Sequence, residues 1–184
     1  MGVELFNNGK HACVMFNDLV KDGGHAVQTN QFLIVDHEEG AILDPGGNMV
    51  FAELTFHLRK YLPLKDVKYI LASHADPDVI SSLGRWMSLS NANLIISDLW
   101  ARFVPHFCKE DNTHHRIIGV SDSGGTLRLG RSEIVCLPAH FMHSEGNFQF
   151  YDPVSKILFS GDLGVSLEDG SFSSGLDADF PSQI

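Results

Sequence analysis

Three potential metal ligands occur at alternate positions where a buried strand is expected to end. In the stretch YILASHADPDVISSLG, which spans residues 69–84, His74, Asp76 and Asp78 follow the apolar run. On a strand that continues into a loop, this spacing projects all three side chains to one face. Two carboxylates so close together would force one to protonate unless a divalent cation lies between them. The alternative is that Asp76 and Asp78 are loop and helix-cap residues.

Two later segments bring similar groups to strand ends. SEIVCLPAH carries an apolar run to His140, and KILFSGD ends at Asp162, where the preceding glycine allows a sharp turn. His143, three residues after His140, either contacts the metals or lies on the surface. Imidazole and carboxylate donors from three strand ends, without thiolate, predict a preorganised metal site. Two imidazoles and three carboxylates exceed what one four-coordinate zinc needs and suit two metals that share a carboxylate.

The predicted site needs strands that stop at one edge of the fold. Apolar runs bounded by turn residues predict ten strands, at 11–18, 27–36, 40–47, 67–73, 91–97, 116–121, 126–130, 132–139, 147–153 and 156–162. Helical spacing predicts helices at 48–62, from Asp78 to about Met87, and at 98–108 with Asp98 as the N-cap. Strands outnumber helices, and the helices lie in the middle of the sequence. This order predicts an α/β fold with sheets packed face to face and helices outside.

Length and composition fit a cytoplasmic protein with one α/β domain. The chain has 184 residues, of which 43 % are hydrophobic and 20 % charged. Its formal net charge of −10 argues against nucleic acid or an anionic membrane as a partner. We expect no membrane span and no signal peptide. The three cysteines lie far apart without a C-x-x-C pair, which predicts reduced thiols.

We expect the domain to occupy residues 1–165. Residues 166–184 are rich in Ser, Gly and Asp and carry only isolated apolar side chains. This composition is typical of a loop, a disordered tail or the beginning of a segment that the sequence truncates.

The order HADPDV, then His140, then Asp162, together with LDPGG at residues 43–47, resembles the metallo-β-lactamase superfamily over nearly the whole chain. The superfamily motif H-x-H-x-D-H holds two zinc ions in its hydrolases. Here Asp76 and Val79 stand where the second and last His would be. A carboxylate at the first of these positions is similar to the diiron branch, as in flavodiiron reductases, which usually carry Glu. The segment AHFMHSEGNFQFYDPVSKILFSGDLG most resembles oxygen-binding diiron proteins that lack a flavodoxin module.

This resemblance implies an αββα sandwich, its last part missing or disordered here, that holds two iron ions, with zinc or manganese as alternatives. The implied ligands are His74, Asp76 and His140 on one iron, Asp78 on the other and Asp162 between them. The family's remaining ligand, a His beyond the last residue of this sequence, would complete the second iron site. Hard carboxylate donors favour iron in its ferric state. Asp44, in LDPGG, either supports the ligands from behind or is a simple turn residue.

The leading hypothesis is a non-haem diiron protein that binds dioxygen. It would act either as an oxygen sensor with a signalling partner or as an oxygen reductase, so enzymatic activity and catalytic residues stay open. No flavodoxin-like phosphate loop is visible, so no FMN site is expected, and a reductase would need an external electron donor such as a rubredoxin. The alternative is a metal-dependent hydrolase of phosphodiesters or thioesters, since the fold alone does not decide function. A scaffold with a degraded site that binds no metal is a third possibility.

Overall fold

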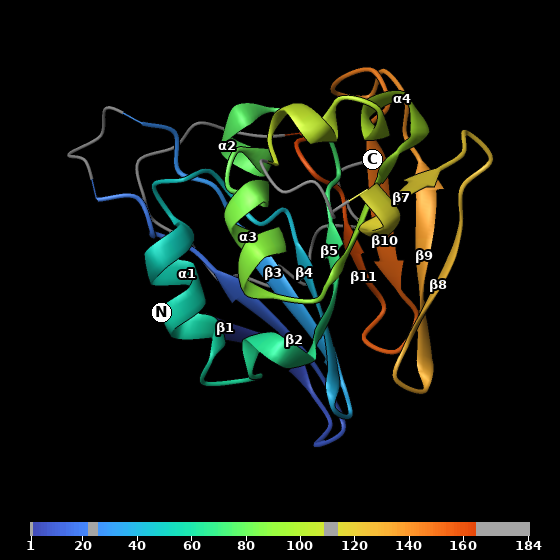
Figure 1. The fold of residues 1–184 in the computed structure, drawn as a ribbon. Coiled ribbons are helices and arrows are strands. Elements are labelled where there is room, and N and C mark those ends of the chain that lie inside the picture. The colour runs from blue at the N-terminus through green and yellow to red at the C-terminus, as the bar shows by residue number, and fades with distance from the viewer. Residues whose placement is uncertain (1, 22–25, 109–113, 165–184) are drawn as a thin grey trace.

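Two sheets pack face to face, and helices cover the outer face of the larger sheet (Figure 1). The computed structural model describes residues 2–21, 26–108 and 114–164. Within these ranges the layers are helix, sheet and sheet, and the second helical layer of the predicted sandwich is not formed by the described residues. The predicted α/β class with face-to-face sheets is confirmed. The expectation for residues 166–184 lies outside the described residues.

The larger sheet has seven strands in chain order: β1 (Gly2–Asn7), β2 (His11–Phe16), β3 (Gln31–Asp36), β4 (Glu39–Leu43), β5 (Val67–Leu71), β6 (Asn93–Ser97) and β7 (Ile117–Val120). Strands β1 to β4 pair antiparallel, whereas β4 to β7 pair parallel. The smaller sheet is antiparallel and consists of β8 (Gly125–Leu129), β9 (Ser132–Pro138), β10 (Phe148–Asp152) and β11 (Ile157–Phe159), in the order β11-β10-β9-β8.

Short helices connect the parallel strands. They are α1 (Phe51–Leu58), α2 (Pro77–Ile80), α3 (Leu83–Leu89) and α4 (Asp98–Ala101), with 3-10 turns η1 (Leu64–Asp66), η2 (Val104–His106) and η3 (His114–Arg116). Among the described residues, no helix combines the length and the apolar character that crossing a bilayer requires.

The larger sheet is buried on both faces, which explains its continuous apolar runs. In β3, Leu33 packs in the core beneath the helices, and its neighbour Ile34 packs between the two sheets. Because successive side chains of a strand point to opposite faces, one apolar run serves both cores. Trp86 of α3 is fully buried in the first core, and Phe148 and Phe150 of β10 are buried in the second.

All three predicted helices are shorter than their sequence pattern predicts. The helix predicted at 48–62 forms only as α1, Phe51–Leu58, between the N-cap Val50 and the C-cap Arg59. The predicted helix from Asp78 to about Met87 breaks into α2 and α3, because the Ser82 hydroxyl and backbone N–H both donate to the Gly46 carbonyl. The predicted helix at 98–108 ends at Ala101 and resumes as η2, whose Pro105 lacks the N–H that an α-helix interior needs.

One helix cap and one strand also differ from the sequence prediction. Asp98 was the expected N-cap of α4, but the Ser97 side chain accepts from Leu99 N at 3.2 Å, so the cap lies one residue earlier. Strand β1 was not predicted at all. It lies at the edge of the sheet, and its side chains are exposed or half-buried, which leaves a weak hydrophobic pattern.

Strand ends from both sheets meet at one edge of the sandwich. Parallel strands β4 and β5 stop in register at Leu43 and Leu71, so the residues that follow them lie side by side. The smaller sheet reaches the same edge, because Phe148 N, at the beginning of β10, donates to the Ser73 carbonyl at 2.8 Å. This is the edge that carries the candidate ligands.

Candidate metal centre

Ser73, just beyond β5, is held by groups from both sheets. Its backbone N–H and its hydroxyl each donate to one carboxylate oxygen of Asp44, both at 2.8 Å. Its carbonyl accepts from Phe148 of the smaller sheet. Asp44 therefore does more than form a turn: it fixes the backbone immediately before His74 and supports that residue from behind, as one of the two sequence interpretations proposed.

These contacts determine which nitrogen of His74 carries the proton. Burial raises the pKa of Asp44 to about 6, and its two carboxylate oxygens accept the backbone N–H and the hydroxyl proton of Ser73. Ser73 Oγ lies 2.8 Å from His74 Nδ1 and has no second proton to give. Nδ1–H is therefore the donor of that hydrogen bond, and Nε2 of the neutral ring keeps its lone pair.

His74 Nε2 points at two carboxylates without bonding to either. The side chain is completely buried, and Nε2 has no hydrogen-bond partner among the described residues. It lies 3.5 Å from Asp76 Oδ2 and 3.7 Å from Asp162 Oδ2. A buried lone pair that faces two carboxylates is costly unless a cation lies among them.

His143 completes this group from the opposite side. Its Nε2 lies 3.3 Å from Asp76 Oδ2 and 3.8 Å from Asp162 Oδ2, and its ring centroid is 4.7 Å from that of His74. Donor atoms of His74, Asp76, His143 and Asp162 all lie within 4.8 Å of one another. We call these four residues the ligand group.

The ligand group contains three of the five predicted ligands. His74 and Asp76 come from the loop after β5 and Asp162 from the loop after β11, whereas Asp78 and His140 are not members of the group. Asp78 lies half-buried in the first turn of α2. Like His74 Nε2, His140 Nε2 is buried without a hydrogen-bond partner among the described residues; it lies 3.4 Å from Asp122 Oδ1, and the ring packs edge-on against Phe148. Metal binding by Asp78 and His140 stays a prediction.

The sequence left His143 either in contact with the metals or on the surface, because His140 is the first imidazole after the apolar run of β9. The intervening loop reverses the chain. Phe141 adopts a left-handed backbone conformation, φ 63°, and its N–H donates to the Ser144 carbonyl at 3.0 Å. Trp100 Nε1 also holds this loop through the Glu145 carbonyl, at 2.9 Å. A local spacing of three residues gives no sign of this reversal.

The donor set fits a transition metal. Two imidazoles and two carboxylates are ligand types that zinc, iron and manganese all accept. A dication among them would bind the orphaned Nε2 of His74 and offset the two facing carboxylates. The residues present therefore fit the metal that the sequence predicts.

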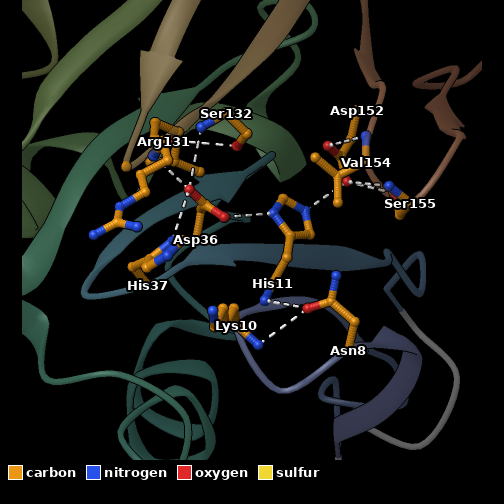
Figure 2. Close-up of polar contacts among 12 residues, drawn as sticks. Asn8, Lys10, His11, Asp36, His37, Arg131, Ser132, Asp152, Val154 and Ser155 are labelled. Carbon is orange, nitrogen blue, oxygen red and sulfur yellow. Dashed lines mark hydrogen bonds and ion pairs between the residues drawn. The ribbon is translucent and has the colours of Figure 1, made fainter.

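A second histidine–carboxylate group lies at the other end of the sandwich (Figure 2). His11 bridges the two sheets, with Nδ1 3.0 Å from Asp36 Oδ1 and Nε2 2.7 Å from Asp152 Oδ2. Burial opposes a charge on this ring, but hydrogen bonds with Asp152 and Asp36 outweigh it and raise the pKa of His11. Cys13 Sγ donates to Asp152 at 3.3 Å, and burial raises the pKa of this thiol to about 12.

Although His11, Cys13 and Asp152 are close enough to share a metal ion, their donor atoms are already used. Asp152 also accepts hydrogen bonds from the backbone and side chain of Ser155. Burial raises the pKa of Asp152, but hydrogen bonds from His11 and Ser155 prevail and lower it to about 2. His11 is held between two carboxylates, and both of its ring nitrogens are already engaged by carboxylate oxygens.

Comparisons with known proteins identify the family of this chain. The family model described as "ODP family beta lactamase" matches residues 27–183. A structure described as the peroxy diiron species of the chemotaxis sensor ODP is 35 % identical, covers 98 % of this chain and 71 % of that chain, and gives a TM-score of 0.81. The apo state of the chemotaxis sensor ODP from T. denticola is 37 % identical over 93 % of this chain and 66 % of that chain, with a TM-score of 0.79.

More distant likenesses show the fold alone. The metal-soaked Flv1 flavodiiron core from Synechocystis is 19 % identical, with a TM-score of 0.74 over 98 % of this chain and 47 % of that chain. An uncharacterized protein of Methanocaldococcus jannaschii is 25 % identical over 133 residues, which are 72 % of this chain and 33 % of that protein. The chain thus spans about a third of the length of this curated relative. The predicted kinship with diiron proteins of the metallo-β-lactamase type is confirmed at the level of family and fold.

Proposed function

Because the chain belongs to the family described as "ODP family beta lactamase", we propose that it is a non-haem diiron protein that binds dioxygen. The observation that carries the proposal is the buried lone pair of His74 Nε2, which faces Asp76, Asp162 and His143 without a hydrogen bond of its own. Two similar solved structures are described as the chemotaxis sensor ODP, and one of them as a diiron species.

In this proposal the ligand group holds the first iron, and His143 takes the place that the sequence prediction gave to His140. Asp162 Oδ2 lies 3.7 Å from His74 Nε2 and 3.8 Å from His143 Nε2, so Asp162 is the candidate to be shared by two ions. Asp78 remains the candidate for the second ion, because it lies in the helical turn that follows Asp76. When bound, two iron ions would supply the electrons that reduce dioxygen.

The chain's own residues orient the donors and maintain their charge. Asp44 and Ser73 hold the His74 ring through its Nδ1, so that Nε2 would face the metal. Pro77 favours an extended backbone at the preceding residue, Asp76 (φ −70°, ψ 147°). The Asp76 carboxylate points towards His143. The two carboxylates stabilise a ferric rather than a ferrous centre.

We propose a sensor in preference to a reductase. Its partners would be dioxygen and a signalling protein, and the description of the similar structures as chemotaxis sensors supports this choice. A reductase would depend on an external electron donor. Lys68 and Arg85 flank the His74 loop in sequence, and both have other partners: Lys68 Nζ lies 2.7 Å from Glu39 Oε2, and the Arg85 guanidinium stacks over the Phe51 ring at 4.0 Å. Hydrolysis of phosphodiesters is therefore disfavoured.

Metal analysis and an optical spectrum test the proposal. Full-length protein purified without added metal should contain iron, and the anaerobically reduced sample should change its spectrum on exposure to air. Stoichiometric zinc with no colour and no response to air would contradict the proposal and favour the hydrolase.

Two variants test the ligand assignment in the same assay. His143→Ala should lower iron affinity by roughly tenfold or more, because it removes a direct ligand. His140→Ala, its matched control, should retain iron because His140 lies outside the ligand group. Loss of iron from His140→Ala alone would return that residue to the ligand set in place of His143.

A further inference from the structure

A cavity of about 220 Å³ lies beside the ligand group. Its walls come from Ala75, Ile80 of α2, Ile96 of β6, Trp100 of α4 and Val104 of η2. Apart from His106, which also lines the cavity, its side chains are aliphatic or aromatic, and Ile80, Ile96 and Val104 are buried. Figure 1 shows α2 and α4 near the same end of the molecule, above the ends of the parallel strands.

The cavity borders the His74 loop directly and the His143 loop through Trp100. Ala75, in its wall, is the residue between His74 and Asp76. On the other side, Trp100 donates its indole N–H to the Glu145 carbonyl, two residues after His143. A molecule in this cavity would therefore be separated from the candidate metal centre by one short stretch of the His74 loop.

The shape and chemistry of the walls select the class of ligand. An apolar wall offers water too few hydrogen-bond partners, and an apolar cavity of roughly 150 Å³ in another protein stays dry and binds benzene or xenon. Pockets for drug-sized molecules are larger, at roughly 300–1,000 Å³. Phe103 and Phe107 form an exposed rim, with 40 % and 45 % of their surfaces accessible, so a ligand can enter from solvent.

We infer that this cavity is a binding site for small uncharged apolar molecules, dioxygen among them, next to the metal centre. The choice of dioxygen rests on the proposed function, whereas affinity for apolar molecules rests on the cavity walls alone. By concentrating an apolar gas beside the ligand loops, the site would raise the rate at which dioxygen reaches the reduced centre.

Xenon is the probe, because it binds apolar cavities without needing iron. Xenon NMR of the full chain should show a saturable shift, both with and without iron. Val104→Phe should abolish the saturable component by filling the cavity, and Ile80→Phe should do the same from a different element. The matched control is Val154→Phe, which makes the same change at a position that is 37 % exposed and outside the cavity lining. Circular dichroism should show that all three variants fold.

A second measurement separates the cavity from the function. In iron-loaded protein, Val104→Phe should slow the association of dioxygen with the reduced centre by roughly fivefold, while its iron content stays that of the wild type. Wild-type protein without saturable xenon binding would overturn the inference, as would equal xenon binding by Val104→Phe. If Val104→Phe loses xenon binding but keeps the wild-type rate of dioxygen association, the role of the cavity in dioxygen delivery is overturned. Xenon binding in a protein that takes up no iron would contradict the proposed function and leave the cavity site intact.

Discussion

Two groups of histidine and aspartate side chains lie at opposite ends of the same sandwich, yet they end in different chemical states. His11 has both ring nitrogens bonded to carboxylates, at 3.0 and 2.7 Å. His74 has one nitrogen bonded to Ser73, and the other faces two carboxylates at 3.5 and 3.7 Å. Both rings are buried.

The difference shows what separates a structural clamp from a metal site in this protein. In the His11 group every donor and acceptor is used, so the imidazolium and its two carboxylates stabilise one another and join the two sheets. In the ligand group the Ser73 contact fixes the His74 tautomer and leaves one lone pair without a partner. An unused imidazole nitrogen that faces two carboxylates, rather than the residue types, marks the candidate metal centre.

Removing the imidazole of His11 should have the largest effect on stability. His11→Ala leaves Asp36 and Asp152 buried without their shared partner, which should lower the free energy of unfolding by about 3–5 kcal/mol. Urea unfolding of the metal-free protein measures this loss. His115→Ala, at an exposed position, is the control and should change the free energy of unfolding by less than about 0.5 kcal/mol. A stability loss as small as that of the control would show that the clamp contributes nothing.

Changing Asp44, the partner of Ser73, should leave His74 without a free lone pair in the ligand group, as is already the case for His11. In Asp44→Asn the amide would donate to Ser73 Oγ, so the hydroxyl would donate to His74 Nδ1 and force the proton onto Nε2. Without the lone pair, iron affinity should fall by roughly 10–100-fold.

Nitrogen NMR of the metal-free protein would report the tautomer directly. The backbone should tolerate the change, because Asn adopts the left-handed conformation of Asp44, φ 50°, without extra strain. Asp98→Asn, at an exposed position, is the matched control. An unchanged tautomer in Asp44→Asn would break the link between the Asp44 contact and metal affinity.

The smallest expected effect is a dependence of stability on alkaline pH. The folded-state pKa of His11 is raised, so its stabilising contribution is complete below the unfolded value of about 6.5 and is lost as pH rises through the folded value. Each unit by which the pKa is raised corresponds to about 1.4 kcal/mol. Urea midpoints measured from neutral to alkaline pH should decline in the wild type. His11→Gln should lack this decline, and an identical slope in both proteins would assign it to other groups.

Sequence reasoning recovered the parts of the site that depend on local pattern. The apolar run of β5 followed by His74 and Asp76 predicted both the strand end and the ligand types, and Asp162 followed from β11 in the same way. It failed where the chain turns on itself. Nothing in the spacing of His140 and His143 indicates that the left-handed conformation at Phe141 brings the second imidazole to the carboxylates.

The boundaries of elements show the same division. The inner strands of the larger sheet were predicted because burial on both faces makes them apolar throughout, whereas β1, an edge strand with exposed or half-buried side chains, was missed. The predicted helix after Asp78 was too long, because Ser82 interrupts it by donating to the carbonyl of Gly46, a residue distant in sequence.

The sequence by itself determined the class of fold, the strand ends and the choice of nitrogen and oxygen donors, because periodicity and residue type are local properties. Only the tertiary structure decided which imidazole nitrogen stays available. His11 meets Asp36 from 25 and Asp152 from 141 residues away, whereas His74 meets Asp44 only through Ser73. A proton's position depends on its three-dimensional neighbours, and these are set by how the two sheets pack.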